Sequence, residues 1–147
     1  MTEAGAIQIA DSVVAELDNG VTNEVFSQEF TPQTNLLPIY ELSELQTLKV
    51  DVMPLPFEQA NEARALTKYD YQIDIGIQKK VSDIDSETRE LCKLVEEISE
   101  YIKKRVLSTA TFASWVKTIN DPLYSVDLLY NQKVFQSVLT ITYRAIA

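Results

Sequence analysis

Polar and apolar residues alternate without interruption from Tyr69 to Ile77. Tyr and Ile occupy the odd positions of this segment, and Asp, Gln and Gly occupy the even positions. A period of two predicts a β-strand with one buried face and one solvated face. We expect the strand to continue through the two following lysines to Val81.

A second long strand is expected over residues 134–146. The side chains expected inside are Phe135, Leu139, Ile141 and Tyr143, and those expected outside are Gln136, Thr140, Thr142 and Arg144. Between the two strands, the segment from Ser86 to Leu107 repeats apolar residues every three or four positions, which predicts an amphipathic helix. Its expected apolar stripe consists of Leu91, Leu94, Val95, Ile98, Ile102 and Val106.

The remaining segments carry weaker patterns. They predict a helix at 4–17 that stops at Asn19-Gly20, strands at 25–30 and 45–53, an extended connection at 31–42, a short helix or loop at 57–67, and a long irregular segment at 108–133. This order predicts an α+β fold, with an antiparallel or mixed sheet of about four to five strands and two main helices packed against it. A chain of 147 residues is expected to form one domain over residues 1–147.

The amino-acid composition excludes more classes of function than any motif in the chain does. Histidine is absent, there is one cysteine, and there are three glycines. These counts exclude Ser-His and Cys-His nucleophile pairs, Cys/His zinc sites and glycine-rich phosphate loops. We therefore expect a protein that is not an enzyme and has no cofactor or metal. The net charge of −9 disfavours specific DNA binding, which needs clustered Lys and Arg.

The targeting signals of secreted and membrane proteins are not expected in this chain. Residues 1–20 lack the basic start and unbroken apolar core of a signal peptide, and no apolar run approaches the length that spans a bilayer. The sequence thus predicts a soluble protein made in the cytoplasm.

Two groups of carboxylates are candidate sites. Asp83, Asp85 and Glu87 lack the spacing of a calcium loop, and their place at a helix start favours capping. Asp70 and Asp74 share the solvated face of the first strand with Gln72, but four strand positions span about 13 Å, too far for a shared proton. This face is interpreted either as an ordinary solvated surface or as an acidic strip that faces a channel.

Aromatic and aliphatic residues of the irregular 108–133 segment form the second candidate site. They are Trp115, Tyr124, Leu128 and Tyr130. Large aromatic side chains on a long loop are typical anchors of protein interfaces, although core packing and a small-molecule pocket are the alternatives.

Several segments together resemble one protein family. They are 9–14 (IADSVV), 26–30 (FSQEF), 48–52 (LKVDV), 69–80 (YDYQIDIGIQKK), 120–124 (NDPLY) and 135–143 (FQSVLTITY). In pattern and order the chain resembles the tail terminator, or tail completion, proteins of long-tailed bacteriophages. The resemblance covers nearly the whole chain but rests on no single diagnostic motif.

The resemblance implies a structural virion protein of the tail and neck, assembled in the host cytoplasm. Such proteins form a homo-oligomer, a hexameric ring, that caps the tail tube protein, stops tail polymerisation and joins the tail to the head connector or head-closure protein. DNA passes through the ring without specific binding, and no membrane is involved. The alternatives are another neck component (a head-closure or adaptor protein), a small ligand-binding α+β domain, or an enzyme that acts through carboxylates and Tyr hydroxyls.

Overall fold

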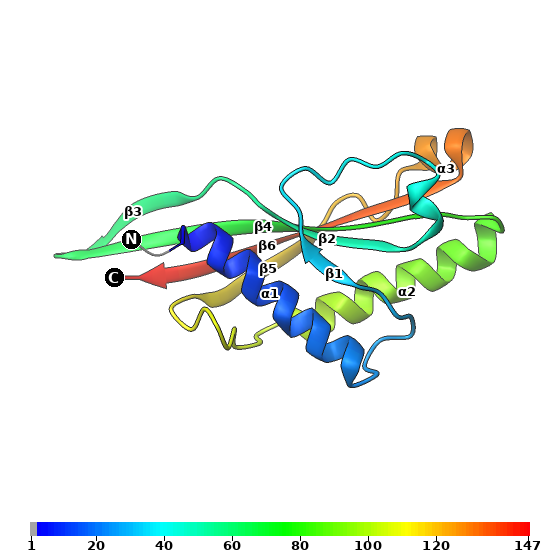
Figure 1. The fold of residues 1–147 in the computed structure, drawn as a ribbon. Coiled ribbons are helices and arrows are strands. Elements are labelled where there is room, and N and C mark those ends of the chain that lie inside the picture. Colours follow the sequence, from blue (N-terminus) through cyan, green and yellow to red (C-terminus); the bar gives the residue numbers. More distant parts are fainter. Residues whose placement is uncertain (1–2) are drawn as a thin grey trace.

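The computed structural model describes residues 3–147, which form three α-helices and a six-stranded mixed sheet (Figure 1). The elements are α1 (Gly5–Thr22), β1 (Pro32–Thr34), the 3₁₀ helix η1 (Glu44–Gln46), β2 (Lys49–Pro54), β3 (Glu58–Ala63), β4 (Leu66–Lys80), α2 (Ile84–Ile102), β5 (Ser114–Asn120), α3 (Val126–Gln132) and β6 (Val134–Ile146). The strand order is β1-β2-β4-β6-β5, and β3 pairs with β4. The predicted α+β fold is confirmed, with one strand and one short helix more than expected.

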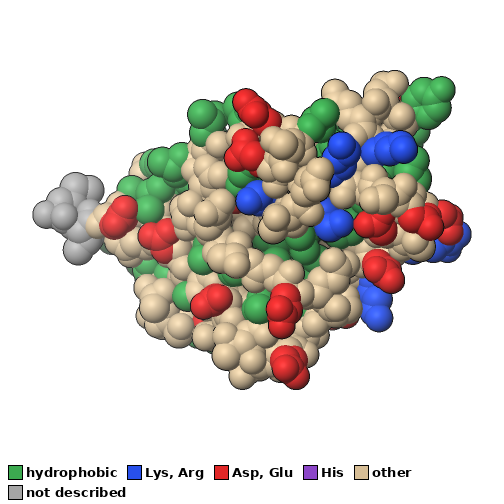
Figure 2. Space-filling model, turned by 45° about the vertical axis from the view of Figure 1, so that its right-hand side comes forward, with side chains coloured by type: hydrophobic (Ala, Val, Ile, Leu, Met, Phe, Trp, Pro, Cys, Tyr) green, Lys and Arg blue, Asp and Glu red, His purple; other side chains and the backbone are tan. Residues whose placement is uncertain are grey.

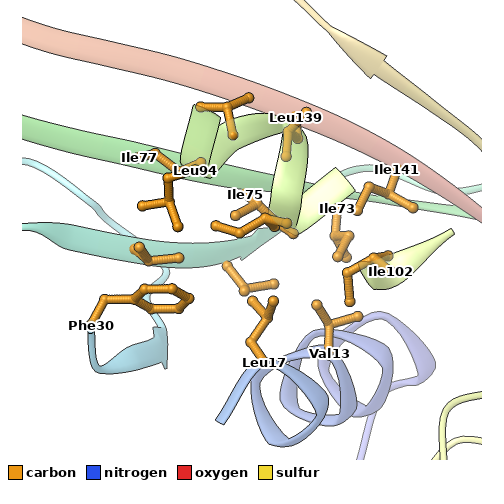
Figure 3. Packing of buried hydrophobic residues seen from close by; sticks show 14 of the residues in the cluster. Val13, Leu17, Phe30, Ile73, Ile75, Ile77, Leu94, Ile102, Leu139 and Ile141 are labelled. Atoms are coloured by element: carbon orange, nitrogen blue, oxygen red, sulfur yellow. The ribbon is translucent and has the colours of Figure 1, made fainter. Parts of the chain in front are cut away.

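The two long predicted strands, β4 and β6, form the antiparallel centre of the sheet. They pair continuously from Lys68 opposite Ile146 to Lys80 opposite Val134. Side chains that lie opposite each other share a face, so the alternation of β4 aligns with that of β6. The fully buried residues Ile73, Ile75 and Ile77 of β4 pack beside Leu139 and Ile141 of β6 under the helices (Figure 3).

One expected outward position of β6 is buried. Thr142 was predicted to face solvent, but it is only 5% exposed. It lies between Gln72 of β4 and Lys117 of β5, and these neighbours on both sides remove it from water.

Helices α1 and α2 cover one face of the sheet, which we call the covered face (Figure 1). The predicted stop of α1 at Asn19-Gly20 is wrong, because the helix continues to Thr22. Gly20 serves close packing instead, since a Cβ there would lie 2.6 Å from the Phe26 ring. Helix α2 ends at Ile102, earlier than predicted, and Val106 is 72% exposed rather than part of the apolar stripe.

The segment 57–67 is neither helix nor loop, as it was predicted to be. It forms β3 and a tight turn in which Ala65 has a φ of 66°. Strands β2 and β3 follow each other along the same side of β4, and Pro54 and Pro56 lie at the junction between them. The β3–β4 hairpin extends beyond the helices at the end of the sheet where α1 begins and β6 ends (Figure 1).

The predicted strand at 25–30 is also wrong. Phe26 and Phe30 are buried, with ring centroids 5.3 Å apart, but the backbone between them bends instead of joining the sheet. Glu97 of α2 holds this bend, since its carboxylate accepts hydrogen bonds from the backbone N–H and the hydroxyl of Ser27, at 3.0 and 2.7 Å. The alternation of 25–30 therefore reflects two aromatic anchors of a loop.

Two further boundaries differ from the sequence prediction. The connection at 31–42 contains β1, which pairs with β2 in parallel. The strand expected at 45–53 begins at Lys49, because Glu44–Gln46 form η1 with Leu45 buried.

The segment 108–133 is more regular than predicted. It contains the strand β5, which pairs with β6, and the short helix α3. Ser125 caps α3 through a hydrogen bond from the Leu128 N–H to its hydroxyl, and Lys133 ends it with a φ of 55°.

Candidate interaction surfaces

Asp70, Gln72 and Asp74 lie together on the face of the sheet opposite α1 and α2, which we call the open face. All three are half-buried. Asp70 accepts two hydrogen bonds from the Arg144 guanidinium, at 2.8 and 3.2 Å, and Asp74 accepts one from the Thr140 hydroxyl at 2.6 Å. The structure thus places the predicted strip on one face, and gives both carboxylates partners on β6.

The Arg144 pairing changes the electrostatics of this strip. The hydrogen bonds from Arg144, helped by its positive charge, hold the pKa of Asp70 below its usual range. Asp70 therefore stays ionised at neutral pH, but its charge is largely neutralised within the chain.

A shallow hollow of about 400 Å³ lies beside this ion pair on the open face. It is lined by Pro56, Phe57, Glu58, Asp70, Gln72, Val116, Lys117, Thr142 and Arg144. Two carboxylates and two cations make the lining neutral overall, with Phe57 as its exposed aromatic wall.

The connection from β1 to η1 crosses another part of the open face and is tied to it by polar contacts. The Tyr40 hydroxyl donates to Asp51 Oδ2 at 2.7 Å, and Gln33 Nε2 donates to Asp51 Oδ1 at 2.8 Å. Asp51 is only 1% exposed. Burial and the hydrogen bond to Asp51 raise the pKa of Tyr40, so its phenol remains a donor. The alternation of the 45–53 segment predicts a solvated position for Asp51, so this contact leaves no signal in the sequence.

The same connection presents large apolar side chains to water. Leu36, Leu37 and Ile39 are 65–75% exposed, and Leu42 is less so. We call these four residues the loop patch. The sequence does not predict this patch, because the segment 31–42 is expected only to be an extended connection.

Trp115 sits on β5 opposite the fully buried Tyr143 and packs against the core. Its indole N–H donates to the Thr118 hydroxyl at 2.9 Å. It is only partly exposed, so it supports the fold as well as remaining a candidate contact.

The other predicted interface residues surround α3. Tyr130 is 83% exposed, Tyr124 is just exposed and close to Phe135, and Leu128 is half-buried. Leu129 is the buried residue that fixes α3 to the core on the covered side. With Val126, which is 69% exposed, Tyr130 forms what we call the α3 patch. Figure 2 shows that apolar side chains are spread over this view of the molecule among charged groups.

Two of the three carboxylates at the start of α2, Asp83 and Glu87, act as caps as the sequence predicted, whereas Asp85 pairs with Arg89 at 3.1 Å instead. Asp83 accepts from the Ser86 N–H at 3.2 Å, and Glu87 accepts from the backbone N–H groups of Ser82 and Asp83. These backbone hydrogen bonds lower the pKa of Glu87. Among residues 3–147, no cluster of three or more metal-ligating side chains occurs.

Sequence reasoning also missed Glu16, a buried carboxylate of α1. It accepts from the Ser108 N–H at 3.2 Å and lies 3.7 Å from the Arg105 guanidinium, which stacks on Tyr101. Glu16 lies three residues after Val13 and therefore on the buried stripe of α1. This spacing is the feature of the sequence that indicates a buried carboxylate. Glu16 ties α1 to the chain that follows α2.

Within the described part of the chain, no helix is both long and apolar enough to cross a bilayer. Comparison with protein-family models finds no matching family, and comparison with curated proteins finds no matching relative.

Proposed function

We propose that this chain is a ring-forming neck protein of a long-tailed bacteriophage that acts as a tail terminator. Copies assemble head to tail into a closed ring, hexameric as the family resemblance implies. The ring caps the tail tube, ends its polymerisation and joins it to the head connector. In this proposal the protein works through the geometry of its contacts and catalyses no reaction.

The observation that carries the proposal is the presence of two exposed apolar patches on different segments of the chain. The loop patch lies on the connection that Tyr40 ties to Asp51, and the α3 patch lies on the short helix that Leu129 joins to the core. Groups of large exposed apolar side chains mark interaction sites. Head-to-tail contacts use two different surfaces of each subunit, and they close into a ring when the rotation per subunit divides a full turn.

The charge of the chain is compatible with a DNA passage. A net charge of −9 opposes retention of a phosphate backbone. In this proposal the strip of Asp70, Gln72 and Asp74 borders the passage. Asp74 is the better candidate of the two carboxylates, because Asp70 is paired with Arg144.

Light scattering and negative-stain electron microscopy of the purified protein, with and without tail tubes, test the proposal. Rings in either condition are expected. Leu37→Asp and Tyr130→Asp should each weaken assembly by ~10-fold or more, because each buries a charge in an apolar contact. Thermal unfolding of the monomer should hardly change, since both side chains are exposed.

Val106→Asp is the matched control, because Val106 is as exposed as Leu37 but belongs to neither patch. It should assemble as the wild type does. A protein that stays monomeric at high concentration even with tail tubes present would contradict the proposed ring.

A further inference from the structure

Three strands of the sheet pair on one side only, and two of them, β5 and β3, are longer than the three-residue β1. Among residues 3–147, β5 pairs only with β6, and β3 pairs only with β4. The outer backbone groups of both strands are therefore free to pair with another strand.

The two free strands carry opposite charges. Lys117 of β5 is exposed, as are Glu58 and Glu62 of β3, and none of the three has an ion-pair partner among the described residues. Glu58 lies opposite Asp70 in the β3–β4 pair, and Asp70 is paired with Arg144, so Glu58 and Glu62 remain the carboxylates of β3 that can meet a cation of another copy.

The directions and the lengths of β5 and β3 also suit pairing between two copies. β5 runs antiparallel to β6, β6 to β4, and β4 to β3, so β5 and β3 have opposite directions within the sheet. A second copy with its sheet in the same orientation would present β3 antiparallel to β5. The strands contain seven and six residues respectively.

Prolines restrict where such pairing occurs. The part of the β2–β3 side that lies level with β5 contains Pro54 and Pro56. Proline supplies no backbone N–H to a strand pair, so level pairing at this junction is blocked. Pairing of Ile119 with Ala60 of β3 needs a displacement along the strands of about six residues, or ~20 Å, and a staggered register is what closure of a sheet into a barrel requires.

We propose that β5 of one copy pairs with β3 of the next, so that the sheet continues from subunit to subunit. This inference rests on the proposed ring and adds a strand pairing to the contacts that its two apolar patches make. Lys117 then lies opposite Glu62, and Ile119 lies opposite Ala60. This register places an ion pair beside an apolar pair along the joined strands, with Glu62 at the register shift of β3 between Asn61 and Ala63. The acidic β3 also repels a second β3, which favours head-to-tail over symmetric pairing.

Charge reversal tests the pairing through mixing. Lys117→Glu alone and Glu62→Lys alone each place like charges at every contact, so each should weaken assembly by ~10-fold or more. In an equimolar mixture, alternating subunits restore opposite charges at every contact, and assembly should recover. Sedimentation velocity of the two variants and of their mixture measures this, and circular dichroism checks that each is folded.

Cysteine cross-linking gives an independent measurement. In a Cys92→Ala background, the double variant Ile119→Cys with Ala60→Cys should form a ladder of disulfide-linked oligomers under oxidation. Either single cysteine variant should form none beyond trace dimers.

The outcomes separate this proposal from the ring itself. If the wild type forms rings, but the reversed variants assemble normally and no ladder forms, the strand pairing is wrong and the ring stands. If the wild type forms no ring with or without tail tubes, both proposals fail. Recovery in the mixture together with the ladder supports the pairing.

Discussion

Alternate residues of β4 and β6 form the covered face and the open face, and the two faces are stabilised by different kinds of contact. On the covered face, Ile73, Ile75 and Ile77 are fully buried under α1 and α2. On the open face, Asp70 and Asp74 are half-buried, and each is held by one side chain of β6. The covered face is a continuous apolar contact, whereas the open face is a set of separate polar contacts.

This difference decides which face can change without loss of the fold. Removal of a buried aliphatic side chain costs both its transfer free energy and the cavity left behind. A partly exposed polar pair contributes much less, because water can replace either partner. The open face and the free strands beside it are therefore the part of the sheet available for contacts with other molecules.

The largest expected effect is on the covered face. Ile75→Ala should lower the free energy of unfolding by about 3 kcal/mol or more, because Ile75 is fully buried between the sheet and the helices. Gln72→Ala on the open face is the matched control and should change it by less than about 0.5 kcal/mol. Urea denaturation followed by circular dichroism measures both. Equal losses would show that the open face supports the fold as strongly as the covered face.

An intermediate effect is expected where the open face does bury a charge. Asp51→Ala should lower the free energy of unfolding by about 2 kcal/mol, because it leaves the Tyr40 hydroxyl without its acceptor and removes one of the two acceptors of the Gln33 amide. Tyr40→Phe, which removes one donor and keeps the acceptor, should cost less. Faster proteolysis within 35–44 should accompany both changes. If Asp51→Ala left the free energy of unfolding unchanged, other contacts would have to hold the connection.

Periodicity predicted the elements that have one buried and one exposed face. β4, β6 and α2 all have this property, so their sequences carry a clear period. β3 has none, because its residues 58–63 extend beyond the helices and are nearly all exposed, and it exists only through pairing with β4. The period of two in β5 is obscured by a register shift between Trp115 and Lys117 and by the position of the strand at the edge of the sheet.

The candidate surfaces were predictable to a smaller extent. The shared face of Asp70, Gln72 and Asp74 follows from strand alternation alone. Their partners do not, because the pairing of Asp70 with Arg144 depends on the register between strands 74 residues apart. The loop patch and the buried Asp51 also depend on where a connection folds back on the sheet. Contacts between distant segments leave no period in the sequence.

The smallest expected effect concerns the Asp70–Arg144 pair and appears as a dependence on pH. The pair lowers the pKa of Asp70 in the folded state, so its contribution is present above the unfolded-state pKa of about 4 and is lost as pH falls through the folded-state pKa. Asp70→Asn should thus be slightly less stable than wild type at pH 7, and the difference should shrink as pH falls to 3. Urea denaturation at both pH values measures the difference, and Asp70→Asn combined with Arg144→Gln should show no further dependence on this pair. A constant difference between wild type and Asp70→Asn from pH 7 to pH 3 would show that the ion pair does not stabilise the open face, since a cost that does not titrate must come from packing.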